Sequence, residues 1–118
     1  MDNIYRQRML ELYTERSHFG ELKDKTHEIT QKHTSCNDEI TIALKIENGK
    51  ILDAKFNGKL CFVSMVSAEI LAEKIKGLTL DDIKKLTKED LDNFLGVEIT
   101  STRVGCELFP LEVLKKIQ

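Results

Sequence analysis

Hydrophobic and polar residues alternate in the second quarter of the chain, as they do in a half-buried strand. The stretch 40–46 reads Ile-Thr-Ile-Ala-Leu-Lys-Ile, with a period of two. Asn48 and Gly49 follow, a pair that accepts the positive φ angles of a tight hairpin turn, and residues 51–56 are apolar enough to pair back. A third, weaker strand is expected around residues 26–31. The pattern predicts an antiparallel sheet of three strands.

Helical spacing replaces this alternation on both sides of the strands. Apolar side chains in residues 4–13 recur every three or four positions, and Gly20 lies beyond the end of this predicted helix. A second helix is predicted from the apolar positions of 63–75, with Gly77 as its C-terminal cap. This segment gives the longest helical pattern in the chain.

The last third of the chain predicts three shorter helices. Two Thr-x-x-Asp sequences, at 79–82 and 87–90, have the spacing of capping boxes at helix starts. The apolar residues of 111–117 predict a terminal helix whose first turn contains Pro110. Because the strands come first and most helices afterwards, we expect an α+β fold: a three-stranded antiparallel sheet with helices packed beside it, in a single domain spanning 1–118.

Composition narrows the class of protein without identifying it. The 118 residues are 41% hydrophobic and 32% charged, as in an ordinary globular chain. The formal net charge of -2 gives no basic footprint, so we expect no nucleic-acid partner. The sequence has no apolar run of about 18 residues and no signal peptide at its start. We therefore expect a cytoplasmic protein with no membrane partner.

Three cysteines are the main chemical candidates. An odd number does not suit a closed disulfide framework, and a reducing cytosol would keep the thiols free. Cys36, Cys61 and Cys106 are too far apart in sequence to form a local metal knuckle, but each is predicted at the end of an element. A helix N-terminus favours a thiolate. Individually, each cysteine can equally be a small buried hydrophobe.

Two segments of the sequence resemble a known protein family. The segment TSCNDEITIALKIENGKILDAKFNGKLCFVSMVSAEILAEKIKG is similar to the core of the U-type iron-sulfur scaffolds, which include IscU, the N-terminal domain of NifU, and SufU. The opening IYRQRMLELYTERSHFGEL resembles the first helix and loop of SufU. The resemblance implies the same α+β fold. It also implies a site of Cys36, Asp38, Cys61 and Cys106 that holds a transient iron-sulfur cluster, expected to be 2Fe-2S, or zinc when no cluster is bound.

The resemblance implies three alternative functions. In the first, the protein is a scaffold rather than an enzyme, and it assembles a cluster from iron and from sulfur supplied by a cysteine desulfurase, then passes it to apo-proteins. In the second, it is a SufU-like, zinc-bound sulfur acceptor in which Cys106 receives the persulfide. In the third, it is a degenerate family member that acts as an interaction module. An oxygen donor such as Asp38 is harder and more exchangeable than a thiolate, which suits release of a cargo. A solvated loop carboxylate is the alternative for this residue.

Three positions depart from the family pattern. Asn37 stands where Gly is common, Leu60 replaces a Gly before the second cysteine, and Gly105 replaces a His or Lys before the third. A positive φ would be unfavourable for Leu60. The chain also lacks the chaperone-binding Leu-Pro-Pro-Val-Lys motif of IscU, so the subfamily stays open. The histidines are further candidate ligands, with His33 nearest to Cys36; ordinary surface imidazoles are the alternative.

Overall fold

The structure is a computed structural model that describes residues 3–33, 37–99 and 103–118. Its helices and strands are, in chain order, α1 (Asn3–Glu15), β1 (His27–Lys32), β2 (Glu39–Glu47), β3 (Lys50–Lys59), α2 (Phe62–Lys74), α3 (Leu80–Lys84), α4 (Lys88–Leu95) and α5 (Val104–Leu114). The predicted α+β fold is confirmed.

The three strands form an antiparallel sheet in the order β1-β2-β3. Asn48 (φ 53°) and Gly49 (φ 80°) take the left-handed conformations that a tight hairpin turn requires, which confirms the turn between β2 and β3. Gly58 also has a positive φ, of 138°, and a Cβ atom on it would collide with the Glu39 carbonyl oxygen. Only glycine therefore lets β3 approach the start of β2.

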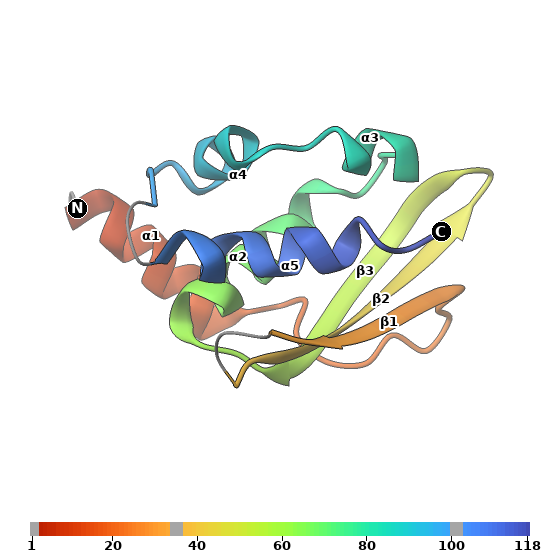
Figure 1. Ribbon diagram of the computed structural model, residues 1–118, viewed down its shortest axis with the longest axis horizontal. Helices are drawn as coiled ribbons and strands as arrows, with labels where there is room; N and C mark the ends of the chain where they lie inside the picture. The colour runs from red at the N-terminus through yellow and green to blue at the C-terminus, as the bar shows by residue number, and fades with distance from the viewer. Residues whose placement is uncertain (1–2, 34–36, 100–102) are drawn as a thin grey trace.

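The helices cover one face of the sheet (Figure 1). Helices α2 and α5 lie next to each other on this face, where α2 contacts β3 and α5 contacts β1 and β2. Helices α1 and α4 pack against α2. Within the described part of the chain, no helix is long and apolar enough to span a bilayer. This layering buries most of α2, the helix whose N-cap is Cys61.

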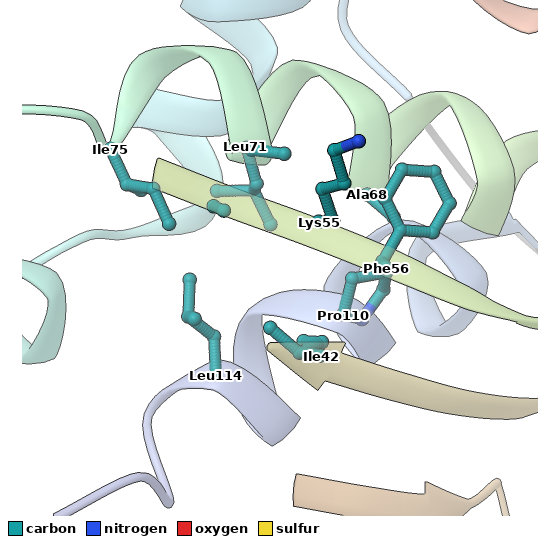
Figure 2. A pocket seen from close by; sticks show the side chains of 10 residues that line it. Ile42, Lys55, Phe56, Ala68, Leu71, Ile75, Pro110 and Leu114 are labelled. Carbon is teal, nitrogen blue, oxygen red and sulfur yellow. The ribbon is translucent and has the colours of Figure 1, made fainter. Parts of the chain in front are cut away.

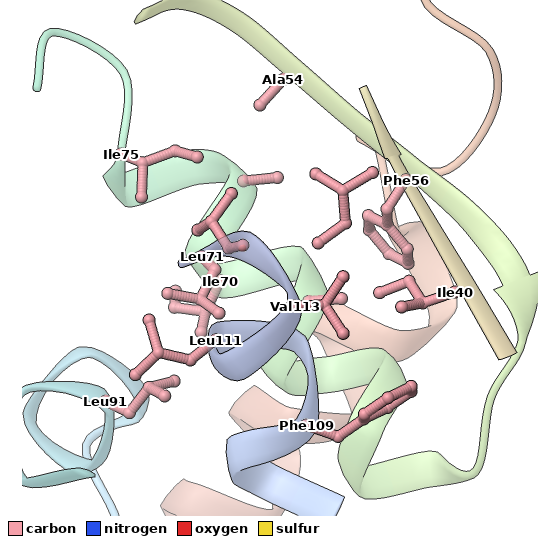
Figure 3. Close-up of a cluster of buried hydrophobic side chains, with 14 of the residues drawn as sticks. Ile40, Ala54, Phe56, Ile70, Leu71, Ile75, Leu91, Phe109, Leu111 and Val113 are labelled. Atoms are coloured by element: carbon pink, nitrogen blue, oxygen red, sulfur yellow. The ribbon is translucent and has the colours of Figure 1, made fainter. Parts of the chain in front are cut away.

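The core lies between the sheet and the two central helices (Figure 3). Ile40 and Phe56 point from the sheet towards Ile70 on α2 and Val113 on α5, and all four are almost completely buried. Removing a side chain such as Phe56 would cost about 3–5 kcal/mol of folding free energy. The core thus fixes α2 and α5 relative to the sheet.

A small apolar cavity marks where β3, α2 and α5 meet (Figure 2). Phe56, Leu71 and Leu114 are among the side chains that line it, and its volume is about 10 Å³. That volume is at the lower limit for one water molecule. The sheet and these two helices are therefore closely packed, and this packing supports the helix starts that carry Cys61 and Cys106.

The helix boundaries confirm some predictions and correct others. Both capping boxes are present, because Thr79 and Thr87 each exchange hydrogen bonds with the Asp three residues later. Helix α2 ends at Lys74 with Ile75 as its cap, and Gly77, which was predicted as the cap, lies two residues further with a φ of 90°.

The prediction that Pro110 lies in the first turn of the terminal helix is wrong. Helix α5 begins at Val104, so Pro110 lies in its interior, and Cys106 lies inside the helix rather than ahead of it. The first turn of α5 contains Gly105 and Glu107 and shows no amphipathic pattern in the sequence, so the apolar periodicity marked only its second half.

Candidate functional site

Cys61 is the N-cap residue of α2. Its backbone is extended (φ -71°, ψ 171°) and its carbonyl accepts the first helical hydrogen bond, from the Met65 N–H, at 2.9 Å. An N-cap residue stands at the turn where the chain enters the helix. The end of β3 and the start of α2 therefore hold the thiol at the edge of the core, where it is half-buried.

Ser64, in the first turn of α2, connects the predicted site residues. The Cys61 thiol donates a hydrogen bond to Ser64 Oγ at 3.3 Å. Ser64 Oγ in turn lies 3.0 Å from Asp38 Oδ2 and 3.0 Å from the Cys106 carbonyl oxygen, and both of these atoms are acceptors. The serine is 0% exposed. One buried hydroxyl thus joins the start of β2, the start of α2 and the start of α5.

Pro110 explains why the Cys106 carbonyl turns to Ser64. In an α-helix this oxygen accepts a hydrogen bond from the N–H of the residue four positions later, which here is Pro110. Proline has no N–H, so this bond cannot form. The Ser64 hydroxyl supplies a donor to the oxygen. The interior proline and the buried serine therefore belong to one arrangement.

Asp38 lies at the border between this network and a polar hollow. Its side chain reaches Ser64, and its backbone carbonyl accepts a hydrogen bond from the His33 N–H at 2.8 Å, although the residue as a whole is only 9% exposed. The hollow has a volume of about 300 Å³, and Lys32, His33 and Lys59 are among the residues that line it. A carboxylate in this position can exchange partners without disrupting the core.

Arg103 brings a cation to the same thiol. One of its guanidinium nitrogens donates to Cys61 Sγ at 3.7 Å, and the residue is exposed. A neighbouring cation is one of the surroundings found at reactive and metal-binding cysteines, so Arg103 adds a feature of such sites to Cys61.

The structure thus brings three of the four predicted site residues to one place. Asp38 and Cys61 meet at Ser64 through their side chains, and Cys106 meets it through its backbone. Cys36 lies outside the described residues. Among the residues that are described, no three His, Cys, Asp or Glu side chains are arranged closely enough to hold a metal ion.

Neither Leu60 nor Gly105 obstructs this arrangement. The non-glycine residues with positive φ in the described ranges are Arg16 and Asn48, so Leu60 has an ordinary backbone conformation. A Cβ atom on Gly105 would meet nothing closer than His33 Nε2, at 4.0 Å. The position therefore has room for a side chain, and the imidazole of His33 borders the space that a side chain would occupy.

The three histidines have different surroundings. His18 bonds to a different set of residues, with Nδ1 2.6 Å from Glu69 Oε2 and Nε2 2.7 Å from the Lys76 ammonium. His27 bonds to the neighbouring Thr26. His33 alone borders the site, and its ring packs edge-on against Phe109.

Ser64 and Arg103 are the contributions that sequence reasoning missed. Ser64 follows Cys61 by three positions, the spacing of an N-cap residue and its N3 partner, so the two side chains share one side of the helix start. That spacing is a signal that was available. Nothing local in the sequence indicates the contact of Arg103 with Cys61, because 42 residues separate the two.

Glu107 follows Cys106 but belongs to a different environment. Its side chain is 0% exposed and lies on the α4 side of α5, with Lys88 Nζ 3.7 Å from Oε1. Burial first, and then the neighbouring Asp92 carboxylate, raise the pKa of Glu107 to about 8, against the attraction of the Lys88 ammonium. The carboxyl group is therefore mostly protonated at neutral pH.

The chain is similar in sequence to known proteins. The chain is 37% identical over 86 residues to the iron-sulfur cluster assembly scaffold protein IscU of Thermotoga maritima, covering 73% of this chain and 61% of the relative. It is 30% identical over 98 residues to the zinc-dependent sulfurtransferase SufU of Bacillus subtilis, covering 83% and 66%. The chain thus spans less than two thirds of the length of each of these relatives.

Solved structures show the same fold. A protein described as an iron-sulfur cluster assembly scaffold for the SUF system, from Fervidobacterium islandicum, superposes with a TM-score of 0.74 at 23% identity, over 92% of both chains. A NifU-like N-terminal protein from Brucella abortus gives 0.75 at 19% identity, over 97% of this chain and 91% of the other. Residues 4–116 match the sequence model of the family described as "NifU-like N terminal domain". The chain therefore belongs to the family of NifU-like N-terminal domains.

Proposed function

We propose that this chain is an iron-sulfur cluster assembly scaffold whose site consists of Cys36, Asp38, Cys61 and Cys106. In this role it receives sulfur from a cysteine desulfurase and iron from the solution, holds the resulting cluster transiently, and passes it to apo-proteins. The observation that carries the proposal is the meeting of Asp38, Cys61 and the Cys106 segment at one buried hydroxyl.

The donor set suits this cargo. Thiolates are the usual ligands of iron in iron-sulfur clusters, and three thiolates with one carboxylate also complete a tetrahedron around zinc. Asp38 is the exchangeable member, because a carboxylate holds a borderline-soft metal less firmly than a thiolate does. Its place beside the polar hollow gives a recipient protein or an incoming ion access to this ligand.

The test is anaerobic reconstitution. Metal-free protein is incubated with ferrous iron, cysteine, a cysteine desulfurase and an excess of dithiothreitol, which reduces the persulfide sulfur to sulfide, and the visible absorption of an iron-sulfur chromophore is followed. We expect the chromophore to appear, with intensity in the range of a 2Fe-2S cluster, and to move to an apo-ferredoxin. Absence of the chromophore under these conditions contradicts the scaffold function.

A SufU-like sulfur acceptor is the second candidate, and the similarity to a zinc-dependent sulfurtransferase over 83% of this chain favours it. In this role zinc occupies the same four residues, and one ligand leaves it to attack the desulfurase persulfide. Cys106 suits this step because it lies in the first turn of α5, where the residue is only half-buried. The attacking thiolate takes the outer sulfur and the desulfurase cysteine leaves as a thiolate.

Mass spectrometry separates the two candidates. Zinc-free protein treated with desulfurase and cysteine should carry its first persulfide on Cys106, ahead of Cys61 and Cys36, if it is an acceptor. Predominant labelling of Cys61 would overturn the assignment of Cys106. Protein that binds neither zinc nor a cluster and takes up no sulfur would instead fit a degenerate interaction module.

A further inference from the structure

The geometry points to Ser64 as the residue that positions the proposed metal ligands, because its hydroxyl ties Asp38, Cys61 and the backbone of Cys106 to one buried point. This inference rests on the proposed function of the site and adds a residue to it. Ser64 is not itself a ligand in this role; it acts through the side chains that it holds.

The first step is the distance between ligands. Asp38 Oδ2 and Cys61 Sγ lie 3.0 Å and 3.3 Å from the same oxygen atom, Ser64 Oγ. Their donor atoms are therefore no more than two hydrogen-bond lengths, or roughly 6 Å, apart before any metal arrives. Asp38 and Cys61 come from different elements, 23 positions apart in the printed sequence. The serine thus gathers donors that the chain by itself keeps apart.

The second step is the number of hydrogens. A serine hydroxyl has one hydrogen to donate, and here two acceptors compete for it at equal distance: Asp38 Oδ2 and the Cys106 carbonyl oxygen. Pro110 deprives that carbonyl of its helical donor, so the second acceptor stays available. When the hydroxyl donates to Asp38 Oδ2, the other carboxylate oxygen can bind a cation, so Ser64 can stay the outer partner of this ligand.

The third step is a contrast with Ser67, one turn further along α2. Ser67 is also 0% exposed, and its hydroxyl also donates to a carbonyl of α5, that of Glu107, at 2.6 Å. The two serines make the same kind of bond between the same helices, but only Ser64 touches side chains of the proposed site. Ser67 is therefore a matched control for any general effect on the packing of α2 against α5.

The experiment measures cobalt(II) binding by metal-free wild type, Ser64→Ala and Ser67→Ala under anaerobic conditions. Loss of an outer partner of a metal ligand typically weakens metal binding roughly 10- to 100-fold. We expect Ser64→Ala to bind cobalt(II) at least about tenfold more weakly and to lose the visible bands of a tetrahedral thiolate site. We expect Ser67→Ala to stay within about twofold of wild type, a difference too small for the loss of such a partner. Thermal unfolding should show a comparable fall in Tm for both variants, on the order of 5 °C.

Wild-type affinity in Ser64→Ala, or an equal loss in Ser67→Ala, would overturn the role of Ser64 while leaving the proposed function intact. Absence of cobalt(II) binding by the wild type would overturn both. If Ser64→Ala does not fold, the comparison moves to Ser64→Thr and Ser64→Val, which have the same shape and differ in the hydroxyl. The proposal then requires the threonine variant to bind at least about tenfold more tightly, and equal affinity would refute it.

Discussion

Two buried carboxyl groups lie near the start of α5, one bonded to Ser64 on α2 and one beside Lys88 on α4, and they differ in what surrounds them. Asp38 has a hydroxyl partner at 3.0 Å and borders a polar hollow of about 300 Å³. Glu107 is 0% exposed, and neither of its oxygens has a hydrogen-bond partner among the described residues. It forms an ion pair with the Lys88 ammonium at 3.7 Å, and the Asp92 carboxylate is also a neighbour. Asp38 thus has a hydrogen-bond partner and lines a polar hollow, whereas Glu107 is completely shielded from solvent.

The difference teaches that burial of an acidic residue does not by itself indicate a ligand site. A buried charge without full compensation costs several kcal/mol, and the group responds by taking up a proton. Glu107 does this, as its raised pKa shows. Asp38 lies next to a thiol, a shared hydroxyl and a hollow, so a cation can reach it. The donors around a carboxylate, together with its access, therefore distinguish a candidate site from a destabilising group.

The largest expected effect lies on the Asp38 side. Replacing Cys61 with Ala removes a proposed ligand and the thiol bonded to Ser64, so we expect cluster and zinc binding to weaken at least about 100-fold, the upper end of what loss of an outer partner costs. Metal analysis after anaerobic reconstitution measures this. The control is Glu107→Gln, at the buried carboxyl group beside α4. This variant should bind the cluster and zinc as tightly as wild type does. Equal loss in both variants would erase the contrast between the two regions.

The next largest effect is on the pH dependence of folding stability, and it involves Glu107. Because the folded protein raises the pKa of this carboxyl from 4.5 to about 8, its contribution to stability is intact below pH 4.5 and is lost as the pH rises through about 8. The slope is at most about 1.4 kcal/mol per pH unit. We expect the stability advantage of Glu107→Gln over wild type to grow by about 4 kcal/mol between pH 5 and pH 8.5, in urea unfolding of metal-free protein.

The matched control for that measurement is Glu112→Gln, on the exposed side of the same helix. It should leave the pH dependence of unfolding unchanged. If Glu107→Gln and wild type lose stability in parallel between pH 5 and 8.5, then Glu107 does not carry a raised pKa in the folded protein.

A smaller effect should separate holding a cluster from releasing it. We expect Asp38→Ala to stay folded, to keep its cluster longer than wild type does, and to transfer it roughly tenfold more slowly, because the exchangeable oxygen ligand is gone. The measurement is the rate at which an apo-ferredoxin gains the cluster. Transfer at the wild-type rate would show that Asp38 is not the ligand that opens first.

The smallest effect lies away from both carboxyl groups. Thr79 caps α3 through its hydroxyl and the backbone N–H of Asp82, at 3.1 Å. Loss of such a cap typically costs about 1 kcal/mol. We expect Thr79→Ala to lower the free energy of unfolding by that amount at neutral pH, with no change in metal affinity. A change in metal affinity in this variant would mean that stability, rather than ligand geometry, limits binding.

Sequence patterns predicted the parts of this molecule that depend on neighbouring residues. The hairpin turn at Asn48 and Gly49 and the caps at Thr79 and Thr87 were read correctly, because each needs only backbone preferences and hydrogen bonds within a few positions. The start of α5 was predicted wrongly, because its first turn has no apolar periodicity and its position depends on packing against α2.

The sequence by itself determined the sheet, the order of the elements and the residue types that suit a metal or cluster. Only the tertiary structure decided that Asp38 and the Cys106 carbonyl share the hydroxyl of Ser64, across separations of 26 and 42 residues. It also decided that Glu107, one position from Cys106, is buried away from that network. The physical reason is that hydrogen bonds and burial between distant segments depend on how α2, α5 and the sheet pack, and no local pattern encodes those contacts.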